Sequence, residues 1–413
     1  MVTLAVVGAG SRGTVYGSFA TAHPARAQVV AVAEPRADRA EVFAAAHDLD
    51  DAQRFATWQA MLDGPRLADV AVIATQDRDH VAAAVALADA GYHLLLEKPM
   101  AIDADGCRAI IDAVERNDVI LGVGHVLRYT PYSRALKALL DEGRIGDVSS
   151  IQHLEPVGWW HFAHSYVRGN WRREDESSSM LLAKCCHDLD LLRYWVGAPA
   201  TSVASFGSLQ HFRADRRPQG AADRCLDCGV EADCPYSAPR LYLGMLDAGW
   251  AGWPVDVVAL DPTPESVSEA LRTGPYGRCV YDCDNDVVDH QVVALEFEGG
   301  VTATFTVAAF TQPGPRRTSV FGTRGQIVGN GRTLRVTDFV TGATEVVEPK
   351  ALATAGMVDM HGGGDVGLVS AFVDAVAAGD ASLVLSGPAE TLESHLLVFA
   401  AEQSRLEGRV VRL

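Results

Sequence analysis

The pattern of apolar and polar positions changes once along the chain, near residue 125. Before that point, short runs of Val, Ala, Ile and Leu alternate with Ala-rich stretches of helical length. The apolar runs are Leu4–Val7, Val29–Ala33, Val70–Ala74, His93–Leu96 and Val119–Val123. Continuous apolar runs separated by helices are typical of parallel strands in a sheet covered on both faces. The sequence therefore predicts a doubly wound α/β domain of the Rossmann type over residues 1–124.

After this point, strand-like stretches follow one another directly. They are Val148–Leu154, Ser202–Leu209, Asp289–Phe297, Val301–Val307, Ser319–Phe321, Leu334–Thr337 and Thr344–Val347. Several alternate polar and apolar residues, as expected for an antiparallel sheet with one covered face. Helices are expected near Asp365–Ala378 and Pro388–Leu406. Residues 125–413 are thus predicted to form a second α/β domain with a large, mostly antiparallel open sheet.

An insertion rich in Pro, Gly, Trp and Cys interrupts the second domain at about residues 213–286. A stretch of this length without structure is uncommon inside a compact domain. We therefore expect a short helix near Ser237–Leu246 and a further element that holds the insertion in place.

Composition and charge narrow the class of protein. The chain has 413 residues, 48% of them hydrophobic and 21% charged, and a formal net charge of −18 at pH 7. This acidity argues against a nucleic-acid or anionic-membrane partner, since both require clustered Lys and Arg. No apolar run reaches the length of about 18 residues that spans a bilayer, and no signal peptide is visible after Met1. We expect a cytoplasmic protein.

A glycine-rich turn follows the first predicted strand and opens a helix, with the sequence GAGSRG over residues 8–13. Gly8 permits the tight turn, Gly10 lets the backbone approach a pyrophosphate, and Gly13 allows close packing of helix and strand. The helix start at Ser11 and Arg12 offers free N–H groups to phosphates. The pattern predicts a nicotinamide dinucleotide site.

Glu34 ends the second predicted strand, where a carboxylate meets the adenosine ribose hydroxyls in such sites. Its charge repels a 2′-phosphate, which favours NAD over NADP. Arg36 argues in the opposite direction, because an arginine at that place can accommodate the phosphate.

A Glu97-Lys98-Pro99 segment ends the fourth apolar run, at the carboxyl edge of the sheet where open α/β folds bind ligands. A lysine near the cofactor could orient a substrate hydroxyl or ease its deprotonation. An isolated lysine is more often a solvated surface charge.

Several motifs together resemble the glucose–fructose oxidoreductase/inositol dehydrogenase (Gfo/Idh/MocA) family. They are GAGSRG, Ala74-Thr75 with His80, Glu97-Lys98-Pro99, Arg128-Tyr129 and Gly143-Arg144-Ile145-Gly146. The resemblance implies a Rossmann domain followed by an α/β domain with an open antiparallel sheet that often mediates oligomerisation. It also implies oxidation or reduction of sugars and cyclitols, with Lys98 in the active site and Thr75, His80 and Glu97 near the cofactor.

The family carries a helix in the second domain with an Asp, a His four positions later and another Asp three further. Here His187 and Asp190 match, but the first Asp falls on Ala183, beside Lys184. On a helix, Lys184, His187 and Asp188 share one side. His187 is a candidate acid–base group near neutral pH, and Lys184 could lower the pKa of His187 or bind an anionic substrate group. The alternative is a His187 paired with Asp190 along the helix.

Other candidate substrate-binding residues lie on either side of this helix. Upstream, residues 159–172 are dense in aromatic, His and Arg groups, which suit carbohydrate recognition. The same segment could instead pack beneath the insertion. The complete candidate set is Arg128, Tyr129, His164, Arg168, Trp171, Arg172, Lys184, Asp188 and His361.

Five cysteines lie in or next to the insertion: Cys225, Cys228, Cys234, Cys279 and Cys283. Thiolates from two loops form the arrangement that tetrahedral zinc prefers, and metal binding would organise a segment poor in apolar residues. Four of the five are expected to hold a structural zinc. An iron–sulfur cluster and free thiols are the alternatives.

Three functions remain open on the sequence. The first is an NAD-dependent oxidoreductase acting on a secondary alcohol of a sugar, sugar derivative or cyclitol. The second is an NAD-dependent glycoside hydrolase that works by transient oxidation, elimination, hydration and re-reduction, as some relatives of the family do. The third is an NAD-binding sensor without turnover. A homo-oligomer, dimer or tetramer, is expected.

Overall fold

The first 125 residues fold around a parallel sheet. The computed structural model describes residues 1–413. Six strands pair in the order β3-β2-β1-β4-β5-β6, all parallel. The strands are β1 (Val2–Val7), β2 (Ala27–Ala33), β3 (Arg54–Phe55), β4 (Val70–Ile73), β5 (His93–Leu96) and β6 (Leu121–Val123). The helices are α1 (Ser11–Ala22), α2 (Ala37–Ala46), α3 (Trp58–Leu62), α4 (His80–Asp89) and α5 (Ala104–Arg116). The predicted doubly wound α/β domain of the Rossmann type is confirmed.

The second sheet has nine strands in the order β14-β13-β12-β11-β7-β10-β9-β8-β15. They are β7 (Val148–Pro156), β8 (Ala200–Ser208), β9 (His290–Phe297), β10 (Thr302–Ala308), β11 (Arg317–Gly322), β12 (Gly325–Gly329), β13 (Leu334–Asp338), β14 (Thr344–Val347) and β15 (Val411–Arg412). Every pair is antiparallel except β7 with β10. The mostly antiparallel sheet is confirmed, and β12 and β15 are strands that the sequence did not predict.

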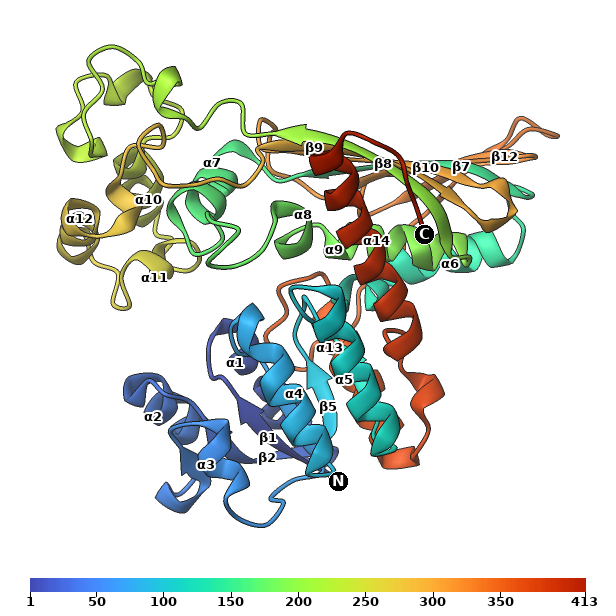
Figure 1. Ribbon diagram of the computed structural model, residues 1–413, viewed down its shortest axis with the longest axis horizontal. Helices are drawn as coiled ribbons and strands as arrows, with labels where there is room; N and C mark the ends of the chain where they lie inside the picture. Colours follow the sequence, from blue (N-terminus) through green and yellow to red (C-terminus); the bar gives the residue numbers. More distant parts are fainter.

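Helices cover one side of this sheet, with α6, α9 and α14 lying beneath it in Figure 1. The helices of this part of the chain are α6 (Pro131–Asp141), α7 (Trp159–Phe162), α8 (Met180–Ala183), α9 (Cys186–Val196), α13 (Gly364–Ala378) and α14 (Pro388–Glu407). Along β9 buried and exposed residues alternate strictly after His290, because the covered face holds the core and the other face has no helix against it.

One helix from the end of the chain returns to the first domain. Residues Val366 and Phe372 of α13 share a hydrophobic cluster with Val6 and Val15 of the Rossmann sheet and helix α1. Helices α4 and α5 pack against the opposite face of the Rossmann sheet, so that α13 and α1 share one face of it. In Figure 1, α13 lies in the lower lobe, below the second sheet. This packing brings the start of α13 to the edge of the sheet where the glycine-rich turn lies.

The insertion between β8 and β9 forms its own small helical unit beside one end of the sheet (Figure 1). Its helices are α10 (Ala238–Asp247), α11 (Val255–Val258) and α12 (Pro264–Thr273). Ser237 caps α10 by accepting a hydrogen bond from Arg240 N at 3.1 Å. The helix predicted near Ser237–Leu246 is therefore confirmed, whereas α11 and α12 were not predicted.

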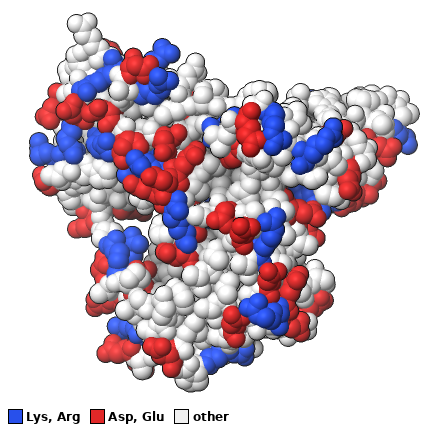
Figure 2. Space-filling model, in the orientation of Figure 1, with Lys and Arg blue, Asp and Glu red and all other residues white.

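Charges of both signs are interspersed over the face shown in Figure 2, and no patch of Lys and Arg gathers there. None of the helices has the length and apolar character that crossing a bilayer requires.

Candidate active site

The glycine-rich turn lies at the carboxyl end of β1, and its glycines are required by close backbone approaches. Gly8 has a φ of +92°, and a Cβ atom on it would lie 2.5 Å from the carbonyl oxygen of Ala74 at the end of β4. A Cβ on Gly13 would lie 1.9 Å from the carbonyl oxygen of Gly8. Gly10 precedes α1, and a Cβ on it would meet only the Arg39 side chain, at 3.8 Å. The turn therefore presents the start of α1, at Ser11 and Arg12, to an anionic ligand.

We expect Gly13→Ala to weaken dinucleotide binding and to lower the free energy of unfolding by about 1–3 kcal/mol, since the added methyl group overlaps backbone atoms. Isothermal titration with NAD and thermal unfolding measure the two effects. Gly64→Ala is the matched control, because nothing lies within 4 Å of a Cβ at Gly64. Equal NAD affinity in the two variants would contradict the assignment of this turn.

Glu34 directly follows β2 and lies beside the same turn. Its buried carboxylate accepts hydrogen bonds from Ala9 N at 2.8 Å and from Arg36 N at 3.0 Å. The guanidinium of Arg36 turns to Asp38 at the surface. Glu34 thus braces the glycine-rich turn with one oxygen and leaves a negative charge where the ribose of a dinucleotide is expected.

Arg12 and Glu97 form an ion pair next to the glycine-rich turn. Arg12 forms ion pairs with Glu97 after β5 and with Asp365 at the start of α13, the latter at 2.7 Å. The Glu97 carboxylate also accepts from Tyr16 Oη at 2.9 Å. Burial by itself would raise the pKa of Glu97, but the charges of Arg12 and Lys98 keep it below its usual value. These side chains tie the two domains together at the cofactor edge instead of facing a ligand freely.

Lys98 follows β5 at the same edge and reaches the second domain. Its Nζ donates to the carbonyl oxygen of Ala183, at 2.8 Å. A continuous helix was expected here, but α8 ends at Ala183 and α9 begins at Cys186. The last carbonyls of a helix have no partner within it, so the break frees the oxygen that holds Lys98. The family resemblance places an Asp at position 183. In this chain the residue there is Ala183, and its backbone carbonyl oxygen accepts the hydrogen bond from Lys98.

His187 lies in the first turn of α9 next to Lys98. Neither of its ring nitrogens has a hydrogen-bond partner within the chain, and Nδ1 is fully buried. Burial, followed by the positive charge of Lys98, lowers the pKa of His187 well below its ordinary value. The alternative of a pair with Asp190 is wrong, because Asp190 binds Arg128. A neutral imidazole without a partner is available to accept a proton.

His361 and Asp365 complete this side of the site. The His361 ring lies 6.2 Å from that of His187, and its Nδ1 is 3.1 Å from an oxygen of Asp365. Burial alone would raise the pKa of Asp365, but His361 and Arg12 hold it well below its ordinary value. Asp365 is therefore a charged anchor shared by His361 and Arg12.

A second set of charges lies behind Lys184. Lys184 Nζ is 3.5 Å from Glu155, which is buried at the end of β7. Arg316 bridges Glu155 at 3.1 Å and Asp188 at 3.0 Å between its Nη2 and Oδ2. Asp188 also binds His153, and although burial opposes it, these partners lower its pKa to about 2. Asp188 was predicted to bind substrate, but it is fully buried in this network. Glu155 and Arg316 were not predicted, since no local motif marks them.

Nearly the whole chain matches one family of known proteins. Residues 2–125 match the oxidoreductase family with an NAD-binding Rossmann fold (GFO_IDH_MocA), and residues 137–413 match the C-terminal alpha/beta domain of the same family. The chain belongs to the Gfo/Idh/MocA family. YteT of Bacillus subtilis (strain 168), named as an oxidoreductase, is 24% identical over 63% of this chain and 60% of its own length. Inositol 2-dehydrogenase of Pseudomonas fluorescens (strain SBW25) is 30% identical over 56% of this chain and 68% of its own length.

The fold as a whole is shared with solved structures. A levoglucosan dehydrogenase in complex with NADH and levoglucosan superimposes with a TM-score of 0.71 at 20% identity, covering 100% of this chain and 99% of that one. The sequence alignment with YteT, in contrast, spans about 60% of that relative. The Gfo/Idh/MocA assignment therefore fixes the fold and the cofactor domain, while the substrate must be argued from the site.

Three of the predicted ligand-facing residues serve the structure of the domains instead. Arg128 is buried and binds both carboxylate oxygens of Asp190, at 2.7 and 2.8 Å. Tyr129 is buried against Ser386, with its Oη 3.0 Å from the serine Oγ. His80, which the family resemblance placed near the cofactor, is buried with Nδ1 2.7 Å from the carbonyl oxygen of Pro99, and so braces the segment that carries Lys98.

The aromatic segment splits between the insertion and the surface. His164 is buried, bonds Tyr242 at 2.8 Å and stacks on Tyr276, so it was wrongly placed at the substrate. Burial and then Arg168 lower its pKa to about 3. Arg168 is also buried beneath the insertion, where it donates to the backbone oxygens of Arg278 and Tyr236.

Trp171 and Arg172 follow at the surface, where Trp171 is exposed and Arg172 pairs with Asp284 at 3.0 Å. Most of residues 159–172 therefore pack beneath the insertion, which is the second of the two interpretations that the sequence left open.

Proposed function

We propose that this protein is an NAD-dependent oxidoreductase that transfers hydride between nicotinamide and a secondary alcohol of a sugar, sugar derivative or cyclitol. The observation that carries the proposal is the meeting of Lys98 and His187, from two domains, at the carboxyl edge of the Rossmann sheet. The Lys98 charge is close enough to lower the pKa of His187. Glu34 and the turn at residues 8–13 lie along the same edge.

The residues divide the chemistry between them. The ammonium group of Lys98, fixed on the Ala183 carbonyl, can donate to the alcohol oxygen and stabilise the negative charge that develops there. His187, neutral and without a partner, accepts the hydroxyl proton. Bound NAD supplies the acceptor for the hydride that leaves the same carbon. The products are a ketone, NADH and a proton, so atoms and electrons balance.

Glu34 supports NAD over NADP as the cofactor. A carboxylate oxygen beside the glycine-rich turn repels the 2′-phosphate, and Arg36, the residue that could have received that phosphate, is paired with Asp38. The turnover assay repeated with NADP measures this preference.

A second function is favoured by one feature of the site. The Asp position is Ala183, and Lys184 with Glu155 forms an additional ionisable pair close to it. Such a pair could serve elimination and addition of water after a transient oxidation, which is the chemistry of an NAD-dependent glycoside hydrolase. In that reaction the hydride returns to the product and no NADH accumulates.

One experiment separates the functions. The protein is incubated with NAD and a panel of polyols, cyclitols and glycosides in deuterated water, and NADH absorbance and products are followed. NADH formed in proportion to a ketone supports the oxidoreductase. Glycoside cleavage with deuterium next to the transiently oxidised carbon and no NADH contradicts it and supports the hydrolase. Tight NAD binding with no reaction across the panel contradicts both and indicates a sensor.

The open face of the nine-stranded sheet supports assembly as a homo-oligomer. Phe206 on β8 and Val292 on β9 are register partners with exposed side chains on that face, and Val346 on β14 is exposed as well. Exposed apolar groups on a sheet without covering helices are typical of protein–protein interfaces. A dimer or tetramer in analytical ultracentrifugation is the expected result.

A further inference from the structure

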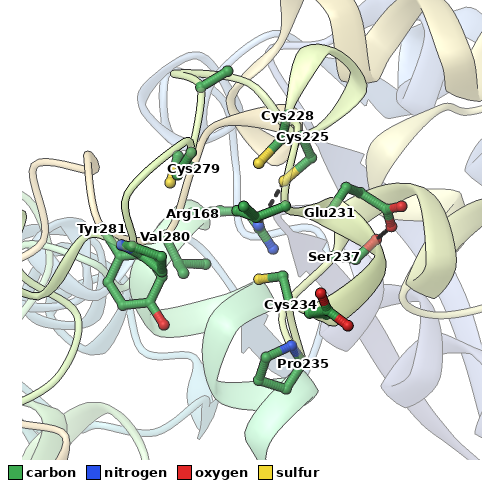
Figure 3. A pocket seen from close by; sticks show the side chains of 15 residues that line it. Arg168, Cys225, Cys228, Glu231, Cys234, Pro235, Ser237, Cys279, Val280 and Tyr281 are labelled. Carbon is green, nitrogen blue, oxygen red and sulfur yellow. Dashed lines mark hydrogen bonds between the residues drawn. The ribbon is translucent and has the colours of Figure 1, made fainter.

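Four cysteines from three stretches of the insertion line one cavity. They are Cys225, Cys228, Cys234 and Cys279, called here the four-cysteine cluster (Figure 3). The cavity measures about 120 Å³, several times the volume of about 30 Å³ that one water molecule occupies in the liquid. All eight cysteines of the chain are free thiols, so no disulfide uses these sulfurs.

Backbone pairing brings the loops of the cluster together. The first loops carry short 3₁₀ turns at Cys225–Asp227 and Glu231–Asp233, so that each following cysteine faces inward. An antiparallel bridge joins Arg224 to Arg278, and Cys279 N donates to Asp223 O at 2.8 Å. Cys279 is therefore fixed opposite the first pair although it is distant in sequence.

Cys283 does not belong to this arrangement. Its Sγ donates to the carbonyl oxygen of Cys279 at 3.2 Å, and it does not line the cavity. The sequence left open which four of five cysteines act together, and the structure separates Cys283 from the others.

A buried positive charge faces the same cavity. Arg168 is 1% exposed and has no carboxylate partner. Its Nε donates to Arg278 O at 2.8 Å, and its Nη2 donates to Tyr236 O at 2.9 Å and lies 3.4 Å from Cys225 Sγ. Nη1 has no partner at all. Burying a guanidinium without a counter-charge is costly, and thiolates in the cavity would supply that charge.

We propose that the four-cysteine cluster binds a metal centre through four thiolates, with Arg168 as its counter-charge and as an N–H donor to Cys225. Zinc and iron–sulfur clusters are the centres that four cysteine thiolates hold in proteins. With four thiolate ligands, either centre carries a net negative charge. That charge would balance the guanidinium of Arg168, whose Nη1 has no partner within the chain. Hydrogen bonds to ligating sulfurs are part of the outer shell of such centres.

The positions of the four sulfurs bear differently on a single zinc ion and on an iron–sulfur cluster. No three His, Cys, Asp or Glu side chains of the chain converge on one point as ligands of a single ion. The sulfurs surround a cavity instead (Figure 3). A polynuclear iron–sulfur cluster holds its cysteine sulfurs farther apart than a single zinc ion, which lies at about 2.3 Å from each sulfur, so the zinc form requires the loops to close further inward.

The centre would hold the insertion against the segment that follows β7. The insertion's own apolar core contains only six buried residues, one of which is Cys225. From this unit Trp253 contacts His161, with ring centroids 4.9 Å apart, on the segment that leads from β7 to the helix of His187. Metal binding contributes folding free energy in segments with so small a core.

Metal analysis of the full-length wild-type protein, purified without chelators under anaerobic and aerobic conditions, tests the proposal. About four irons with four acid-labile sulfides per chain, together with a visible absorption band, assign the cluster. About one zinc per chain and no iron assigns a single ion and supports the thiolate site. Absence of both metals, with the four thiols of the four-cysteine cluster alkylated in the native protein, overturns the proposal.

Variants locate the metal. Cys234→Ser is expected to lose the metal, and Cys283→Ser, whose hydroxyl can still donate to Cys279 O, is expected to keep it. Arg168→Met is expected to weaken metal affinity by about tenfold, as for other outer-shell residues. Equal metal content in the two cysteine variants would overturn the assignment. If Cys234→Ser does not fold, alkylation of the wild type before and after chelation decides, since the cluster thiols must become reactive only after metal removal.

Discussion

Replacing Lys98 with Met is expected to lower kcat for oxidation of the substrate alcohol by about 10²- to 10⁴-fold, the contribution that a positioned proton-handling group makes. Met keeps the length of the side chain but removes the charge and the donor that the Ala183 carbonyl holds. NAD affinity is expected to change little, because the glycine-rich turn and Glu34 do not contact the ammonium group. Steady-state turnover and isothermal titration with NAD measure the two quantities.

Lys350→Met is the matched control, because Lys350 is exposed and forms no hydrogen bond or ion pair with a residue of the site. It removes the same charge from the protein and should leave both quantities as in the wild type. Turnover of Lys98→Met close to that of the control would contradict the proposed role of Lys98. A loss of NAD binding together with turnover would instead place Lys98 at the cofactor.

His187→Asn is expected to lower kcat by about 10²- to 10⁴-fold as well, since asparagine cannot accept the hydroxyl proton. The side chain makes no hydrogen bond within the chain, so the substitution should lower the melting temperature little. His290→Asn, at the surface end of β9, is the control. Turnover and thermal unfolding distinguish a proton acceptor from a structural residue, because a structural role would shift the melting temperature in step with activity.

The pH dependence of the wild type follows from the same residue. Burial and the charge of Lys98 lower the pKa of His187 below its ordinary value of about 6.5. Because the neutral form accepts the proton, kcat/KM for oxidation should stay constant as pH falls through 6.5 and decrease only below it, as the imidazole becomes protonated. An acid limb centred at or above pH 6.5 in the wild type would contradict this assignment.

The charges around Lys184 have a further consequence for specificity. Arg316 and Lys184 are paired with the buried Glu155 and Asp188, so their positive charges are already balanced within the chain. Hydroxyl groups, which donate and accept hydrogen bonds, do not require an unpaired positive charge. We therefore expect a neutral polyol or sugar to be turned over in preference to a strongly anionic substrate, although Lys184 was a candidate for binding an anionic group when only the sequence was considered.

The sequence by itself determined the cofactor domain. Its strands are short apolar runs, and the glycine-rich turn is a local constraint: Gly8 and Gly13 face backbone atoms so closely that no other residue fits. Glu34 and Lys98 follow β2 and β5, so they lie at the one edge to which parallel strands carry their carboxyl ends. Each of these features depends on residues close in sequence or on the regular geometry of the sheet.

Only the tertiary structure decided which polar side chains remain available to a ligand. Arg128 and Asp188 are consumed by buried ion pairs, and Arg168 lies beneath the insertion. Arg12 meets Asp365 from the other end of the chain. Partners so distant in sequence leave no periodic or local signal, since their contact depends on how the two domains pack. The break between α8 and α9, which frees the Ala183 carbonyl for Lys98, likewise depends on packing that overrides helical propensity.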